Sequence, residues 1–192
     1  MEALKILGKS MERKQQIRAE LKKTRSALTS AQCRSYSNTI CEKIWNIIEK
    51  EHAEIIYCYY PLGNEVDVLP LAQKALIAGK KVAFPRTDGE NMDFFQVMSL
   101  SEFQKGAFSI MEPIGEYSIS EKTPLVIVPG LGFDKNRNRI GYGKGFYDRY
   151  FARFPSCRKI GAAYAAQIID CIPTDSYDTK LDVIVTEREE IE

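Results

Sequence analysis

Apolar side chains recur along the chain at helical spacing in its first quarter. Residues 10–28 place Ile17, Leu21 and Leu28 on one face among lysines and arginines, and Ser10 can cap the helix that this spacing predicts. Thr29 and Ser30 then interrupt the pattern and can cap a second helix. The buried stripe of this second helix is predicted to be Tyr36, Ile40, Ile44, Ile47 and Ile48.

Farther along, short apolar runs alternate with helical patterns. Strands are predicted at 54–60, 81–85, 92–97, 125–128, 159–165 and 182–186, and helices at 68–78 and 144–154. This alternation predicts an α/β fold of one domain over residues 1–192. Its core would be a mostly parallel, twisted, Rossmann-like sheet with helices on both faces. Ligands of such sheets bind beyond the carboxyl ends of the strands.

One segment at this expected ligand edge is rich in glycine. Residues 139–150 read Arg-Ile-Gly-Tyr-Gly-Lys-Gly-Phe-Tyr-Asp-Arg-Tyr, so that Gly141, Gly143 and Gly145 alternate with other side chains. Alternating glycines let the backbone turn and present N–H groups to an anion, especially before a helix. Residues 134–149 contain five Lys or Arg and two Asp, which suits a polyanionic ligand. The segment is therefore interpreted as a nucleotide triphosphate site.

The spacing of these glycines matches neither standard nucleotide motif. It is not G-x-x-x-x-G-K-[ST], and it is not G-x-G-x-x-G. A tight connection between a strand and a helix is the alternative interpretation. Asp148 follows the three glycines and can hold Mg²⁺ together with one of several acids near the C-terminus. The spacing does not identify which of these acids it would be.

Two further stretches carry candidate binding side chains. Lys14 and Arg18 lie four residues apart on one helical face and can reach a phosphate or a carboxylate, although a solvated basic face is the alternative. Glu65 and Asp67 follow the predicted strand 54–60, where a carboxylate can accept hydrogen bonds from an amino-pyrimidine ring. Ordinary polar surface is the alternative for these two acids.

Composition removes several classes of function. The formal net charge of +1 disfavours general nucleic-acid binding. No run of about 18 apolar residues is present, so no membrane span is expected. Five cysteines without a Cys-x-x-Cys pair favour reduced thiols and a cytoplasmic location. His52 is the only histidine, so Ser–His, Cys–His and zinc-hydrolase mechanisms lose most of their support.

The residues described above together resemble the 5-formyltetrahydrofolate cyclo-ligase family. Residues 139–150 resemble its signature, residues 128–134 (Val-Pro-Gly-Leu-Gly-Phe-Asp) its lead-in, and residues 64–67 its acidic substrate loop. Lys14 and Arg18 resemble its N-terminal basic helix, and Gln167, Ile172-Pro173 and Asp178 follow in the family's order. The resemblance covers most of the chain.

This resemblance implies an ATP-dependent cyclisation of 5-formyltetrahydrofolate to 5,10-methenyltetrahydrofolate, with release of ADP and phosphate through a phosphorylated formyl intermediate. It assigns ATP to Lys14, Gln15, Gln16, Ile17 and Arg18 and to Arg139, Ile140, Gly141, Tyr142, Gly143, Lys144, Gly145, Phe146 and Tyr147. It assigns the folate to Arg18, Leu62, Glu65, Asp67, Tyr142 and Phe146. Arg139, Lys144 and Tyr147 would be catalytic, and Asp148 and Asp178 would hold Mg²⁺.

The expected partner is a small-molecule substrate, 5-formyltetrahydrofolate, which could carry a polyglutamate tail. The protein is expected to be a monomer or weak dimer that binds neither nucleic acid nor membrane. Another ATP- or sugar-phosphate-using α/β enzyme is one rival interpretation. A folate- or nucleotide-binding regulator without turnover is the other.

Overall fold

A computed structural model describes residues 2–106, 110–115 and 123–192. The helices are α1 (Glu2–Ser26), α2 (Ser30–Lys50), α3 (Leu69–Ile77), α4 (Phe146–Arg153) and the short 3₁₀ helix η2 (Ala165–Gln167). The strands are β1 (Ile55–Tyr57), β2 (Lys81–Asp88), β3 (Asn91–Val97), β4 (Phe103–Lys105), β5 (Met111–Pro113), β6 (Leu125–Val128), β7 (Gly132–Asp134), β8 (Arg139–Ile140), β9 (Arg158–Ala162), β10 (Ile168–Ile169), β11 (Val183–Val185) and β12 (Glu190–Ile191).

Seven of the strands form the central sheet, in the order β12-β11-β9-β6-β1-β2-β3. The five strands from β11 to β2 run parallel, and only the two outer strands, β12 and β3, pair antiparallel. The parallel strands are largely buried, as their continuous apolar runs require. The prediction of a mostly parallel α/β sheet is confirmed.

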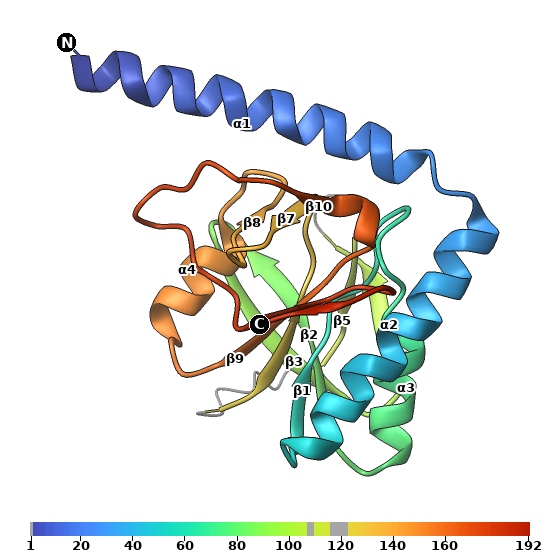
Figure 1. The fold of residues 1–192 in the computed structure, drawn as a ribbon. Helices are drawn as coiled ribbons and strands as arrows, with labels where there is room; N and C mark the ends of the chain where they lie inside the picture. Colours follow the sequence, from blue (N-terminus) through green and yellow to red (C-terminus); the bar gives the residue numbers. More distant parts are fainter. Residues whose placement is uncertain (1, 107–109, 116–122) are drawn as a thin grey trace.

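Helices cover both faces of this sheet. α2 and α3 pack Ile44 and Leu71 against one face, while α4 packs Tyr150 and Phe151 against the other (Figure 1). The prediction of helices on both faces is therefore also confirmed. α3 joins β1 to β2 on the first face, and α4 precedes β9, the neighbour of β6, on the second. The boundary between β1 and β6 is thus a switch point, where open α/β sheets bind ligands.

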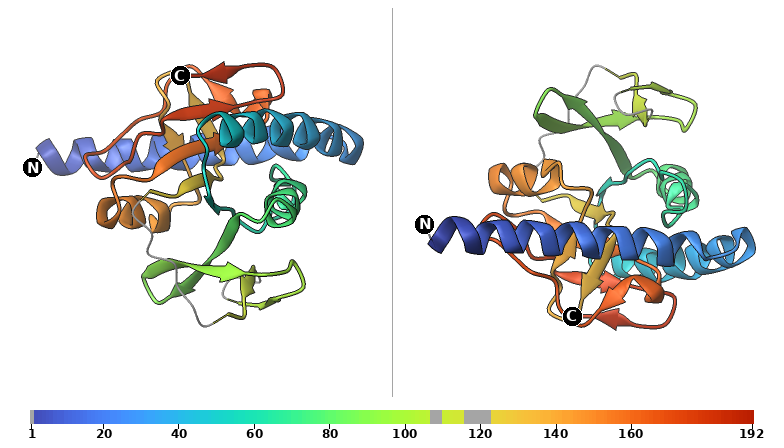
Figure 2. Two further views of the ribbon diagram at one scale, coloured as in Figure 1. Left: turned by 90° about the horizontal axis from the view of Figure 1, so that it is seen from below. Right: turned by 90° about the horizontal axis from the view of Figure 1, so that it is seen from above.

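α1 is the long helix that crosses the carboxyl edge of the sheet. It runs over the small sheet β10-β7-β8 and extends along the whole width of the molecule (Figures 1 and 2). Leu21 of α1 packs with Leu131, Ile140 and Ile172 in a separate apolar cluster. α1 begins at Glu2, earlier than the predicted residue 10, because no proline stops it there.

Two local expectations were wrong. Residues 125–128 form β6 but do not lead directly into the glycine segment, because the hairpin β7–β8 lies between them. The predicted strand 54–60 ends at Tyr57, and residues 58–60 continue as irregular chain toward the carboxyl edge. Among the described helices, none combines the length and apolar character that a bilayer span requires.

Candidate functional site

A cleft of about 760 Å³ opens at the carboxyl edge of the sheet, beside the switch point. Its walls come from stretches that are distant in sequence: Lys14, Gln15 and Arg18 of α1, Tyr59, Tyr60, Leu62 and Glu65 after β1, Pro85 and Thr87 of β2, residues 139–148, and Asp175 with Asp178. This volume lies within the usual range for small-molecule sites, roughly 300–1,000 Å³. The glycine segment and the acidic loop after β1 therefore face one cavity.

The glycine loop, residues 141–145, adopts backbone conformations that its sequence allows. Gly143 has φ +92° and Gly145 has φ +67°, and both values are rarely adopted by residues with a side chain. Gly145 is the N-cap of α4, so the loop ends at a helix N-terminus with its exposed N–H groups. Arg18 donates from Nε to the Gly141 carbonyl at 2.9 Å and fixes the loop against α1.

Arg139 and Asp148 form an ion pair beside this loop. Arg139 Nη2 lies 3.2 Å from Asp148 Oδ1 and 3.0 Å from Oδ2. Asp148 Oδ1 also accepts the backbone N–H of Thr179 at 3.2 Å. This bond ties the C-terminal loop, residues 170–182 between β10 and β11, to α4. Asp148 and Asp178, which adjoins Thr179, both line the cleft.

Lys14 binds the C-terminal loop from the other side. Its Nζ lies 2.7 Å from both Asp175 Oδ2 and Asp178 Oδ2. Burial opposes the lysine charge, but the hydrogen bonds and charges of the two carboxylates outweigh it and raise the pKa of Lys14. Lys14 and Arg18 therefore both face the cleft, as their spacing predicted.

Glu65 is the buried acid of the cleft. Its side chain is 6% exposed, and its oxygens accept from the Leu62 backbone N–H at 2.9 Å and from the Tyr142 hydroxyl at 2.9 Å. Arg25 Nη1 lies 3.5 Å from Glu65 Oε1. Burial raises the pKa of Glu65, and the hydrogen bonds together with the charge of Arg25 oppose that rise.

The Tyr147 hydroxyl is buried and makes no hydrogen bond within the described residues. Of the buried polar side-chain atoms in the described part of the chain, it is one of two without a hydrogen bond. Burial raises the pKa of Tyr147 far above its ordinary value, so the hydroxyl remains a neutral donor. Because unpaired buried polar groups are costly and Tyr147 lines the cleft, this hydroxyl fits a ligand acceptor.

Three predicted site residues do not line the cleft. Asp67 Oδ1 accepts the backbone N–H of Leu69 at 3.0 Å and caps the start of α3. Ile17 packs against the apolar cluster of α1 and β8, and Gln16 is exposed. The remaining predicted site residues, Leu62, Phe146 and Lys144 among them, line the cleft.

The sequence did not single out several residues that the structure places here. Tyr60, Thr87 and Glu112 line the cleft. Asp175, one of the C-terminal acids considered for the metal site, shares the Lys14 ammonium with Asp178. The buried Glu112 accepts from both the backbone N–H and the hydroxyl of Thr87. The only sequence signal for Glu112 was its place before Pro113, and that signal specifies no chemistry.

A magnesium site was predicted on Asp148 and Asp178. Across residues 2–106, 110–115 and 123–192, no three His, Cys, Asp or Glu side chains gather closely enough to hold a metal ion by themselves. Mg²⁺ in phosphate sites needs only one or two carboxylates, with phosphate oxygens and waters as its other ligands. Asp148 and Asp178 both line the cleft and fit such a site. Asp148 also pairs with Arg139, and Asp178 also pairs with Lys14.

An α/β fold with a glycine loop, a set of cations and a buried acid around one cleft defines a class of proteins that bind phosphate-bearing small molecules. Comparison with known proteins narrows the class. The family model "5-formyltetrahydrofolate cyclo-ligase family" matches residues 10–187. The chain belongs to this family.

Relatives and solved structures agree with this assignment. The 5-formyltetrahydrofolate cyclo-ligase of Haemophilus influenzae is 29% identical, over 91% of this chain and 98% of its own. A probable 5-formyltetrahydrofolate cyclo-ligase of Schizosaccharomyces pombe is 31% identical over 91% and 95%. The NMR structure of Aquifex aeolicus 5,10-methenyltetrahydrofolate synthetase superposes with a TM-score of 0.82 at 30% identity, covering 92% of this chain and 91% of that one.

Proposed function

We propose that this protein catalyses the ATP-dependent cyclisation of 5-formyltetrahydrofolate to 5,10-methenyltetrahydrofolate, releasing ADP and phosphate. Family membership over residues 10–187 supports the reaction class. The observation that carries the proposal is a single cleft faced by the glycine loop, by the cations Lys14, Arg18 and Arg139, and by the buried Glu65. Phosphates and an N–H-rich heterocycle would both find partners there.

The nucleotide would bind along α1 and the glycine loop. Lys14, Gln15 and Arg18 supply side chains from α1, and Arg139 and residues 140–147 supply backbone N–H groups and charge. The positive φ of Gly143 and Gly145 supports this assignment, because backbone there can approach a phosphate without a Cβ. Gln16 and Ile17 do not line the cleft and would not contact the nucleotide. Their part would be to support α1.

The folate would bind against the acidic loop. Leu62, Tyr142 and Phe146 offer apolar surface, and Glu65 offers a carboxylate to ring N–H donors. Arg18 lines the same cleft and binds the Gly141 carbonyl of the glycine loop, so it would meet both substrates. Asp67 has no part in the proposal, since it caps α3.

The chemistry needs positioned charge more than a nucleophilic side chain. The formyl oxygen attacks the γ-phosphorus, the bond from that phosphorus to the β-bridging oxygen breaks, and ADP leaves. N10 then attacks the formyl carbon and loses its proton, and phosphate departs with the former formyl oxygen. Arg139 and Lys144 would offset charge on the phosphoryl oxygens, and the Tyr147 hydroxyl would donate to one acceptor in the cleft.

Magnesium is part of the proposal. When bound, Mg²⁺ supplies charge neutralisation at the phosphates, and Asp148 and Asp178 are the carboxylates that would hold it. Arg139 and Lys14 would orient these two carboxylates at the cleft through their ion pairs.

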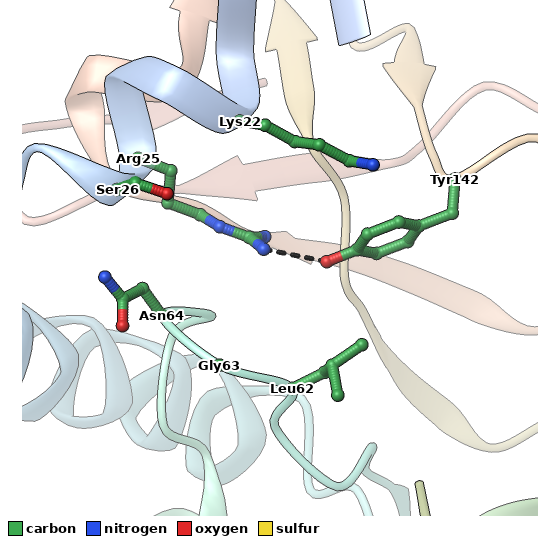
Figure 3. Close-up of a pocket in the computed structure, with 7 residues that line it drawn as sticks. All are labelled: Lys22, Arg25, Ser26, Leu62, Gly63, Asn64 and Tyr142. Atoms are coloured by element: carbon green, nitrogen blue, oxygen red, sulfur yellow. Dashed lines mark hydrogen bonds between the residues drawn. The ribbon is translucent and has the colours of Figure 1, made fainter. Parts of the chain in front are cut away.

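We further propose that the natural form of the folate substrate carries a polyglutamate tail. A groove of about 330 Å³ adjoins the cleft and is lined by Lys22, Arg25, Ser26, Asn64 and their neighbours, with no acid among its lining residues (Figure 3). A chain of carboxylates emerging from the cleft would meet the Lys22 ammonium there, while the buried Arg25 guanidinium is held by Tyr142 and Glu65. That the protein is a monomer or weak dimer stays a prediction, which size-exclusion chromatography tests. Its cytoplasmic location also stays a prediction, which cell fractionation tests.

The decisive measurement is incubation of the purified protein with 5-formyltetrahydrofolate and MgATP, followed by near-ultraviolet absorbance. We expect the methenyl band to appear, to require ATP, and to be lost when Mg²⁺ is chelated. Substrate binding without product would overturn catalysis and favour a regulator. Neither binding nor product would favour an enzyme acting on other phosphorylated substrates.

A further inference from the structure

Arg25 is a buried cation in the last turn of α1, and no part of the proposed reaction uses it. Its side chain is only 9% exposed. Nη2 donates to the Tyr142 hydroxyl at 2.7 Å (Figure 3). Nη1 lies 3.5 Å from both Glu65 Oε1 and the Gly130 carbonyl oxygen. A guanidinium is buried only where partners compensate the loss of water, so these contacts define its role.

The contacts form a chain with a fixed direction. Because Arg25 donates to the Tyr142 oxygen, the Tyr142 hydrogen is free to point to Glu65, and the hydroxyl donates to Oε1 at 2.9 Å. Glu65 Oε2 accepts from the Leu62 backbone N–H. The pair with Arg25 is the one ion pair of Glu65 within the described parts of the chain.

Arg25 and Glu65 lie on opposite sides of a thin wall. Glu65 lines the cleft, and Arg25 lines the groove of Figure 3, while Leu62 and Tyr142 line both. A molecule in the cleft therefore touches Glu65 and Tyr142, and it reaches Arg25 only through them. Any effect of Arg25 on such a molecule is indirect.

We propose that Arg25 is a positioning residue for the folate substrate, holding Glu65 as an ionised acceptor and directing the Tyr142 hydroxyl so that the carboxylate faces ring N–H donors. This inference rests on the proposed function. Without Arg25, Glu65 would be a buried carboxylate with no compensating charge, and it would become protonated. A protonated Glu65 offers fewer acceptor sites to those N–H donors.

The surroundings of Glu65 isolate this effect. The titratable groups that face it, besides Arg25, are the phenols of Tyr59, Tyr142, Tyr147 and Tyr164, the last of which donates to the Glu65 carbonyl oxygen. Burial raises the pKa of each phenol above its ordinary value, so all four stay neutral from pH 5 to 9. Across that range these phenols therefore add no change of charge to that of Glu65.

The experiment measures binding of 5-formyltetrahydrofolate by calorimetry from pH 5 to 9 for wild type, Arg25→Gln and Arg25→Met. Binding should strengthen as pH rises through the pKa of Glu65. In both neutral variants the pH midpoint of this increase in affinity should be higher by about one pH unit or more. Both variants should also bind the folate about tenfold more weakly at pH 7. Affinity for ATP should stay within about twofold of wild type, as expected of a local effect.

Three further variants make the result specific. Arg25→Lys keeps the charge and should leave the pH midpoint near that of wild type. Lys23→Met removes an exposed cation from the same turn and should change neither quantity. In a Glu65→Gln background, Arg25→Gln should cause little additional loss, because the acid through which Arg25 acts is gone.

Several outcomes would overturn the proposal. An unshifted midpoint in the neutral variants would do so, and so would additive losses in the Glu65→Gln background or equal losses for ATP and folate. If a neutral variant does not fold, the other neutral variant and the double variants carry the test. A wild-type protein without folate binding or turnover would refute the proposed function, whereas normal turnover with an unshifted Arg25→Gln would refute only this inference.

Discussion

Gly143 is the residue at which backbone geometry and the cleft constrain each other most closely. Its φ of +92° excludes most side chains, and a Cβ added there would lie 3.3 Å from Arg18 Cζ. The same guanidinium holds the Gly141 carbonyl. A side chain at Gly143 would therefore disturb both the loop and the cation that supports it.

We predict that Gly143→Val lowers ATP affinity at least about tenfold, because strain and crowding move the loop and Arg18. Calorimetry with a non-hydrolysable ATP analogue measures this. Gly79→Val is the matched control, since Gly79 also has positive φ (+77°) but has no atom within 4 Å of an added Cβ and lies outside the cleft. Equal ATP affinities for the two variants would count against the loop assignment.

At single residues, the sequence predicted local backbone geometry but not long-range contacts. Glycine alternation predicted a sharply turning backbone, and the spacing of Lys14 and Arg18 predicted a shared face, because both follow from local geometry. The partners of charged side chains were not predictable. Lys14 binds acids more than 160 positions away, and Asp67 serves α3 instead of the cleft. Such choices depend on how distant segments meet.

α1 is the element that assembles the site. Lys14, Arg18, Leu21 and Arg25 follow one another at spacings of four, three and four, which places them on a single face. Along that face they contact the C-terminal loop, the glycine loop, the small apolar cluster and the acidic loop in turn. Its basic side chains are therefore divided between functional contacts and solvated surface.

We predict that Lys14→Met destabilises the protein by about 1 kcal/mol at pH 7, because Asp175 and Asp178 are partly exposed and water screens the pair. Urea unfolding measures this loss. Since the pKa of Lys14 is raised in the folded state, the stabilisation is complete below the ordinary lysine value of 10.5 and disappears as pH rises through the folded value.

The difference between wild type and Lys14→Met should therefore be constant from pH 6 to 9 and shrink above pH 10.5. Arg13→Met removes an exposed neighbouring charge and serves as the control. An equal loss in the control would show that general helix charge, and not this ion pair, is responsible.

Element lengths explain the remaining errors of the sequence prediction. β6 was predicted at its observed bounds, and the second helix was predicted to start at the observed cap, Thr29. The strands β4, β5, β7, β8, β10 and β12 were missed because runs of two or three residues carry no readable alternation. The hairpin β7–β8 matters most, since it carries Arg139 into the cleft.

For the whole molecule, the cleft is the place where distant parts of the chain converge. Lys14 meets Asp178 across 164 positions, and Tyr142 meets Glu65 across 77. A ligand that spans these segments should stabilise the entire fold, because it binds only when all of them are in place.

We predict that an ATP analogue and 5-formyltetrahydrofolate, each at about 100 times its dissociation constant, raise the free energy of unfolding by about 2.7 kcal/mol apiece. Thermal unfolding followed by circular dichroism measures the shift. The two increments should at least add, since the ligands occupy different parts of one cleft. If either ligand abolished the shift caused by the other, the two would compete for one position, and the proposed division of the cleft would be wrong.

The wall of Leu62 and Tyr142 between the cleft and the groove has a consequence for inhibitors. A compact compound can fill the larger hollow and leave the phenol undisturbed. An elongated compound with an acidic end, like a tailed folate, must pass beside the ring, which its bonds to Arg25 and Glu65 hold in place. Selectivity between short and extended antifolates would thus be decided by the space that one fixed aromatic side chain leaves.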